Sequence, residues 1–194
     1  MKKYIAEFIG ACTLTMAVLG TAVQPTGLPT VLAAGITLGL FVFTIGKISG
    51  AHINPAVTIG ALSLKKISLK EAGYYIFAQF AGAALALIVG GLLHFKLQIS
   101  GYFSWMALVG EAVGALIFTF GIASVVLARE SVPHAAFIIG GSLTIGASIA
   151  VALGANGVLN PAVAFGIGSF GWAYLIGPIV GSVAGMWLYK GIQS

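Results

Sequence analysis

Long apolar stretches alternate with short polar segments along the whole chain. A transmembrane helix needs about 20 mostly apolar residues. Six stretches reach that length, at about 4–23, 30–48, 73–94, 104–128, 134–153 and 172–189. Two further apolar pieces, about 55–63 and 161–169, are too short to cross a bilayer. The pattern predicts an all-α membrane protein with six transmembrane helices and two short helices that enter the membrane without crossing it.

Composition supports a membrane protein. Hydrophobic residues make up 59% of the chain and charged residues 7%, with a mean hydropathy of +1.09, whereas about a quarter of residues are charged in soluble domains. The beginning could be read as a signal peptide, because Lys2 and Lys3 precede an apolar run with a small-residue site before Cys12. Glu7 interrupts that run, which continues to Val23, so we predict a retained first helix. A single cysteine forms no intrachain disulfide.

The net charge of +5 could indicate a nucleic-acid partner, but the positions of the basic residues exclude one. Eight of the nine fall on one side of the membrane if the six helices alternate in direction: Lys2, Lys3, Lys47, Lys65, Lys66, Lys70, Arg129 and Lys190. Only Lys96 falls on the other side. This positive-inside pattern predicts cytoplasmic N- and C-termini. We expect an integral, multi-pass protein of a prokaryotic-type cell membrane, with membrane lipids as partners.

An internal repeat divides the chain into two halves, about 1–98 and 99–194. AEFIGA at 6–11 is similar to GEAVGA at 110–115, which places Glu7 and Glu111 at equivalent positions near the start of an apolar helix. Asn54 follows Glu7 by 47 residues, and Asn160 follows Glu111 by 49. Each half contains three of the six predicted spans. Because three is an odd number, the second half starts on the opposite side of the bilayer from the first. The two halves of this single transmembrane channel domain are therefore predicted to be inverted repeats, with a site between them at the midplane.

Each half contains one Asn-Pro-Ala tripeptide, Asn54-Pro55-Ala56 and Asn160-Pro161-Ala162. Asn is a favoured helix N-cap and Pro is favoured at the first helical position. Eight or nine helical residues extend roughly 13 Å, which is about half the hydrocarbon core. If two such helices enter from opposite faces, their positive N-termini meet at the midplane. There the Asn amides can donate to the oxygen of a small solute, and the dipoles repel cations.

In these motifs the chain resembles aquaporin-type channels of the major intrinsic protein family. The likeness runs from AEFIGA through SGAHINPAVTIG, AQFAG, GEAVGALIF and LNPAV to GPIVG. It implies six tilted helices with two half-helices, a homotetramer with one pore per subunit, and passive passage of water and other small uncharged solutes. It also implies that Glu7 and Glu111 accept hydrogen bonds from loop N–H groups, the alternative being a proton relay, and that His52 contributes to the pore lining. Neither a cofactor nor a metal site is expected.

The outer selectivity filter departs from the family pattern. Relatives usually carry Arg directly after the second tripeptide, where this chain has Val163. The other filter positions, carried over by spacing from the two Asn residues, are Ala34, Ser148 and Gly157. The family typically has an aromatic residue at the first of these and often His or Gly at the second. Small side chains predict a widened outer filter, unless Phe41 or Phe165 swings into it.

Three readings of function remain open at this point. The first is a passive channel for water with other small neutral solutes. The second is a channel mainly for glycerol, urea, ammonia or another neutral solute, suggested by Ala34 and Gly157. The third is a non-conducting structural membrane protein, which the missing Arg favours and the two retained Asn residues oppose. An enzyme is not expected, because the sequence has no nucleophile–base pair, carboxylate dyad or metal-ligand spacing.

Overall fold

The structure is a computed structural model that describes residues 1–24, 26–95, 103–128 and 130–193. The described residues form helices and connecting loops, with no strand, which confirms the predicted all-α fold. The elements in chain order are α1 (Lys2–Val23), α2 (Thr30–Ser49), α3 (Pro55–Ser63), α4 (Leu69–Leu92), α5 (Trp105–Ala128), α6 (Val132–Ala152), α7 (Pro161–Gly166) and α8 (Trp172–Gln193). The six long helices are long and apolar enough to cross a membrane.

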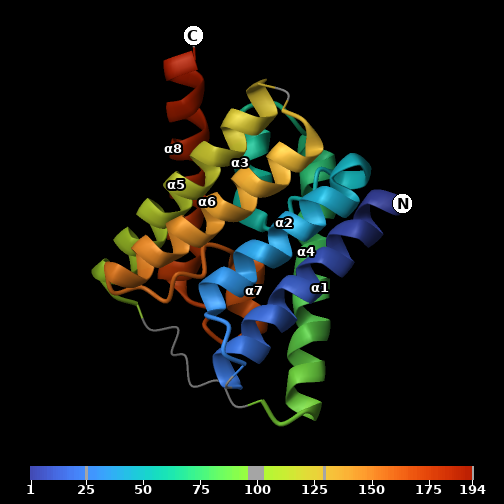
Figure 1. The fold of residues 1–194 in the computed structure, drawn as a ribbon, viewed down its shortest axis with the longest axis vertical. Coiled ribbons are helices and arrows are strands. Elements are labelled where there is room, and N and C mark those ends of the chain that lie inside the picture. The colour runs from blue at the N-terminus through green and yellow to red at the C-terminus, as the bar shows by residue number, and fades with distance from the viewer. Residues whose placement is uncertain (25, 96–102, 129, 194) are drawn as a thin grey trace.

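The order long, long, short, long occurs twice along the chain. Within the first set α1 packs on α2 and α4, and within the second α5 packs on α6 and α8. The two sets meet where α2 packs on α6, while α3 contacts α8 and α7 contacts α4. Both termini lie in the upper half of Figure 1, with α3 in the upper half and α7 in the lower half. The predicted repeat boundary at 98/99 lies outside the described residues, as do Lys96 and Arg129.

Close helix packing depends on glycines at matched positions of the two sets. A Cβ at Gly82 of α4 would lie 2.2 Å from the carbonyl oxygen of Phe8 on α1. A Cβ at Gly181 of α8 would lie 2.1 Å from the carbonyl oxygen of Ala112 on α5. Real side-chain carbons do not approach oxygen so closely, so only glycine permits these backbones to touch. Small residues provide this close packing in membranes, where lipid tails remove the hydrophobic drive between helices.

Some helix boundaries differ from those predicted by hydropathy. The fourth helix begins at Leu69 rather than 73, because the Ser68 hydroxyl caps it by accepting from the N–H of Glu71 at 3.2 Å. The seventh ends at Gly166 rather than 169, because Gly168 takes a left-handed conformation (φ 75°) and closes the helix. The eighth continues to Gln193 rather than ending at 189, past the polar residue Lys190. Hydropathy marks the part of a helix that contacts lipid, whereas capping marks where the helix ends.

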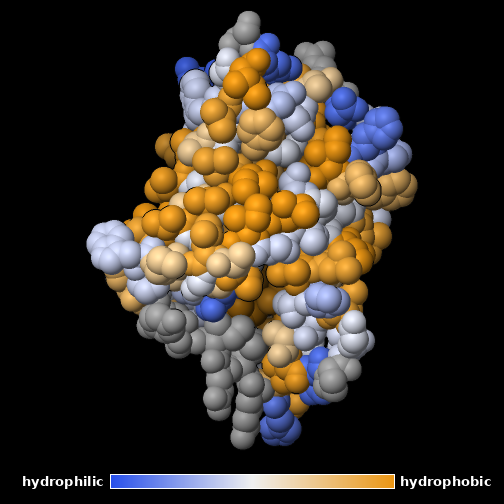
Figure 2. All heavy atoms as spheres, turned by 60° about the vertical axis from the view of Figure 1, so that its left-hand side comes forward, coloured by the Kyte–Doolittle hydropathy of each residue, from blue (hydrophilic) through white to orange (hydrophobic). Residues whose placement is uncertain are grey.

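The outer surface is apolar around its middle. Figure 2 shows hydrophobic residues across the middle of one face, with hydrophilic residues gathered toward its top and its lower edge. Large apolar side chains are widely exposed, including Phe137 at 83% and Phe77 at 75%. Such extensive apolar exposure is costly in water and favourable against lipid.

Candidate functional site

Both Asn-Pro-Ala motifs start their short helices by the same local chemistry. Asn54 has extended backbone (φ −158°), and its Oδ1 accepts from the N–H of Ala56 at 2.8 Å. Asn160 is also extended (φ −149°), and its Oδ1 accepts from the N–H groups of Ala162 at 3.0 Å and Val163 at 3.3 Å. Pro55 and Pro161 occupy the first helical positions. Each Asn therefore uses its carbonyl oxygen to fix a helix N-terminus, which leaves its amide nitrogen to point elsewhere.

The amide nitrogen of each Asn donates a hydrogen bond to the loop that precedes the other Asn. Asn54 Nδ2 donates to the carbonyl oxygen of Leu159 at 2.9 Å, and Asn160 Nδ2 donates to the carbonyl oxygen of Ile53 at 3.0 Å. This reciprocal pair joins residues more than a hundred positions apart and brings the two motifs together inside the bundle. A carboxamide carries two N–H groups. Among the described residues, only one on each Asn finds a protein acceptor, so the second can donate to a solute.

The residue before each Asn has an unusual backbone. Ile53 has φ 39° and Leu159 has φ 52°, in the left-handed region that a β-branched residue such as Ile strongly disfavours. Both residues are fully buried, and hydrogen bonds hold them at both ends. Their N–H groups donate to the carboxylates of Glu7 and Glu111, each at 2.6 Å, while their carbonyls accept from the Asn amides. The strain is therefore maintained by two buried carboxylates and two crossed amides.

Glu7 is at the centre of a hydrogen-bond network beneath the first loop. Its Oε1 accepts from Ser49 Oγ at 2.6 Å and from the N–H of His52 at 3.0 Å. Its Oε2 accepts from Gln79 Nε2 at 2.8 Å in addition to the Ile53 N–H. A fully buried carboxylate is costly unless its oxygens are satisfied. With four donors around it, Glu7 serves as an acceptor that positions the loop.

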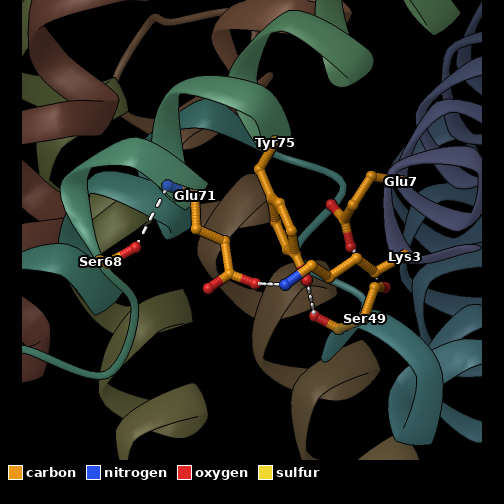
Figure 3. A network of polar contacts seen from close by, with 6 residues as sticks. All are labelled: Lys3, Glu7, Ser49, Ser68, Glu71 and Tyr75. Carbon is orange, nitrogen blue, oxygen red and sulfur yellow. Dashed lines mark hydrogen bonds and ion pairs between the residues drawn. The ribbon is translucent and has the colours of Figure 1, made fainter. Parts of the chain in front are cut away.

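Further contacts tie the surrounding helices together at the end of the bundle that carries the termini (Figure 3). The Tyr75 hydroxyl of α4 donates to the carbonyl oxygen of Ser49 at 2.8 Å. Lys3 of α1 forms an ion pair with Glu71 of α4. Helices α1, α2 and α4 are thus linked around the Glu7 network, which limits movement of the loop that they support.

Glu111 holds the second loop through backbone N–H groups. Its Oε1 accepts from the N–H of Val158 at 2.9 Å, and its Oε2 accepts from the N–H of Leu159. Gly157 precedes this pair with φ 67°, and a Cβ there would lie 2.6 Å from the carbonyl oxygen of Ala147. The second loop is therefore shaped by a glycine and a carboxylate, whereas side chains from three helices surround the first.

Three cavities follow one another past the paired Asn residues. The Lys66 cavity, lined by Ser49, Gly50, His52 and Lys66 among others, has a volume of about 320 Å³. The central cavity, lined by Asn54 and Asn160, has about 20 Å³ open to the centre of a water molecule. The Gly157 cavity, lined by Asn156, Gly157 and Val163 among others, has about 220 Å³. One water needs about 10–15 Å³ on this measure, so the central cavity fits about one.

Shared walls connect these cavities. The residues common to the Lys66 and central cavities are Leu38, His52 and Phe118. The residues common to the central and Gly157 cavities are Val18, Val158 and Val163. Apolar side chains from α1, α2, α5 and α6 complete the central wall, namely Leu14, Val18, Leu38, Phe118 and Leu143. The sequence did not single these residues out, because apolar side chains that face a pore look like those that face lipid.

The predicted filter residues fall into two groups. Gly157 and Val163 line the Gly157 cavity together, and Val163 also reaches the central cavity. Ala34 is partly buried against the apolar core, and Ser148 is exposed with its hydroxyl donating to the carbonyl of Thr144 at 2.8 Å. Within the described residues, neither Ala34 nor Ser148 belongs to the lining of the three cavities.

Neither phenylalanine that was considered as a replacement aromatic lines these cavities. Phe165 of α7 packs edge-on against Phe80 of α4 and against Phe170, with ring centroids 5.9 Å and 6.0 Å away. Phe41 is partly buried against the core, near Gly10 of α1. The walls of the Gly157 cavity consequently contain no aromatic ring and no arginine among the described residues.

Comparison with known proteins agrees with this geometry. The family model described as major intrinsic protein matches residues 1–189. Aquaporin AqpM of Methanothermobacter marburgensis is 34% identical, with 100% of this chain and 98% of that protein covered. Human Aquaporin-5 is 35% identical, with 97% of this chain and 80% of that protein covered. Among solved structures, the aquaglyceroporin from Plasmodium falciparum superposes with a TM-score of 0.77 at 25% identity, covering 99% of this chain and 96% of that one.

Sequence, fold and site therefore agree. The family match extends over nearly the whole chain, and the relatives are covered over most of their length, so the likeness is not confined to one motif. The six membrane-crossing helices and the two half-helices joined at their Asn residues occur in a single arrangement. The chain is an integral, multi-pass membrane protein that belongs to the major intrinsic protein family.

Proposed function

We propose that the chain is a passive channel for water that also admits other small uncharged solutes, and that the three connected cavities are its pore. The observation that carries the proposal is the pair Asn54 and Asn160 at the central cavity, each with one amide N–H left for a solute. A water in this cavity can accept from both amides. Its own protons then point away from the pair, which interrupts a proton-conducting chain.

Exclusion of cations follows from the same pair of half-helices. Each helix N-terminus carries a partial positive charge equivalent to roughly half an elementary charge. The ends of α3 and α7 lie beside the central cavity, because Asn54 and Asn160 both line it. A cation entering this space would lose its water shell against an apolar wall while facing two positive helix ends. We infer that Asn54-Pro55-Ala56 and Asn160-Pro161-Ala162 form the central filter.

The Gly157 cavity supports a second candidate, a channel that conducts mainly a larger or less polar neutral solute, such as glycerol, urea or ammonia. Its volume of about 220 Å³ and its uncharged lining leave more room than a water file requires. The structurally similar aquaglyceroporin is in keeping with this candidate. In either case we propose that Gly157 and Val163 form the outer part of the pathway, together with Ala34 and Ser148 through their family positions.

The assembly and orientation proposals rest on the family. We propose a homotetramer with one pore in each subunit, inverted repeats of about 1–98 and 99–194, and cytoplasmic termini in a prokaryotic-type cell membrane. We also propose that the protein is not an enzyme, since members of its family are channels. Chemical cross-linking in membranes tests the oligomer, and labelling of cysteines placed at each terminus tests the orientation.

Stopped-flow light scattering on proteoliposomes tests the function. The wild type should pass water faster than empty vesicles, and its glycerol rate separates the two candidates. Val163→Arg should lower glycerol permeability roughly tenfold or more while water continues to pass, because the side chain narrows the pathway and adds a fixed charge. Val163→Met, which lengthens the side chain without adding charge, is the control. Wild-type vesicles that pass neither solute faster than empty ones would support the non-conducting alternative.

A further inference from the structure

Charge is distributed unequally along the three cavities. Lys66 is the one Lys, Arg, Asp or Glu side chain among the described residues that line them. It belongs to the Lys66 cavity, at the end of the bundle that carries both termini. The Gly157 cavity at the other end has no charged lining residue in the same part of the chain. The fixed positive charge of the pathway therefore lies at the mouth opposite to Val163.

The backbone at the end of α3 places this lysine. Lys65 takes a left-handed conformation (φ 57°), and its N–H donates to the carbonyl oxygen of Leu62 at 2.9 Å. The Lys66 N–H donates to the carbonyl oxygen of Ala61, also at 2.9 Å. These two bonds close the helix in the manner of a Schellman cap and reverse the chain. As a result Lys66 lines both the cavity and a surface depression, whereas Lys65 lines only the depression.

A half-helix gives this position electrostatic importance. The N-terminus of α3 is positive and lies at the central cavity, so its C-terminus carries the opposite partial charge and lies toward the mouth. Unopposed, that negative end would raise the cation concentration in the Lys66 cavity. Lys66 lies in the turn that follows the end of α3 at Ser63, and its charge offsets that negative end on the cavity side. At the end of α7 the chain continues Ile167-Gly168-Ser169 with no basic residue.

We propose that Lys66 is a charge-selectivity residue, which lowers the concentration of cations at the mouth of the pore. This inference rests on the proposed function, because it assumes that the three cavities conduct. Lys66 supplies a fixed positive charge at one mouth, while Val163 leaves the other mouth without one. The charge along the pathway is consequently asymmetric. A cation that crosses in either direction must pass both Lys66 and the midplane, whereas the Gly157 mouth adds no fixed charge.

The test is potassium flux into proteoliposomes that enclose a potassium-sensitive dye, divided by the water permeability of the same vesicles. Loss of one unit charge about 4 Å from an ion in a water-like medium changes its local concentration about fivefold. Lys66→Met should therefore raise the normalised flux by about that factor, and Lys66→Glu should raise it further. Lys65→Met and Lys65→Glu are the matched controls for the two Lys66 substitutions, because they make the same charge changes at a side chain that does not line the cavity. Both should stay within about twofold of the wild type.

Salt dependence provides a readout that a purely structural role would not show. The Debye length is about 30 Å at 0.01 M salt and about 3 Å at 1 M, so the difference between Lys66→Met and wild type should shrink at high salt. Equal effects of the Lys65 and Lys66 substitutions, or no effect of either Lys66 substitution, would overturn the proposal. If Lys66→Glu does not reconstitute, Lys66→Met decides the question. Failure of the proposed function appears separately, as wild-type vesicles without water permeability.

Discussion

Replacement of Glu7 by Gln tests the support of the first loop. The carboxylate accepts four hydrogen bonds, two on each oxygen, from Ser49, His52, Ile53 and Gln79. A Gln side chain keeps one oxygen and presents an NH₂ group where the other stood. If the NH₂ group takes the place of Oε1, the Ser49 hydroxyl can accept from it, so only the backbone N–H of His52 loses its acceptor. A buried donor left without a partner costs about 1–3 kcal/mol, so we expect Glu7→Gln to destabilise the protein by about that amount.

Glu111→Gln is the equivalent substitution in the second half of the chain. The Glu111 oxygens accept backbone N–H groups, including those of Val158 and Leu159, one on each oxygen. A backbone N–H cannot switch to accepting, so the substitution again leaves a buried donor without a partner, at an expected cost of about 1–3 kcal/mol. Differential scanning fluorimetry of detergent-purified protein should therefore show that each substitution lowers the unfolding midpoint. An unchanged midpoint for either variant would refute the role of that carboxylate as an acceptor that holds its loop.

Two further predictions concern glycines. Gly82→Ala in α4 should weaken packing against α1 by about 1–3 kcal/mol, because the new methyl group would overlap a carbonyl oxygen of that helix. Gly73→Ala in the same helix meets no atom within 4 Å and should not destabilise the protein. The thermal midpoints of the two variants test this prediction. Gly157→Ala should destabilise more than Gly168→Ala, since both have positive φ but only Gly157 also meets neighbouring atoms. Equal midpoints would show that backbone conformation alone sets the cost.

Hydropathy predicted the fold well because crossing a membrane imposes one simple requirement. A lipid-facing helix must be apolar along its length, so the six spans could be located from the sequence to within a few residues. The start of each short helix was predicted to the residue, at Pro55 and Pro161, because an Asn cap followed by Pro is a local signal. The end of α7 was not, since its closure depends on the conformation of Gly168.

The walls of the pathway could not be predicted in the same way. Phe118 and Leu143 lie in helices whose faces differ little in polarity, so no periodicity distinguishes a cavity-facing residue from one that contacts lipid. The left-handed backbone of Ile53 was equally hidden, because its residue type argues against that conformation. It is held by partners that are distant in sequence, Glu7 and Asn160, and only the folded chain brings them together.

The two adjacent lysines after α3 occupy different environments that the sequence does not reveal. In the sequence Lys65 and Lys66 are equivalent, since both contribute to the positive-inside pattern and both follow the same apolar helix. The left-handed turn at Lys65 separates them, because it reverses the chain and leaves only Lys66 beside the cavity. A charge that orients the protein in the membrane can in this way also face the permeation pathway. The Lys65 and Lys66 substitutions therefore separate topology from selectivity, since a topological role requires equal effects and a role in the pore requires unequal ones.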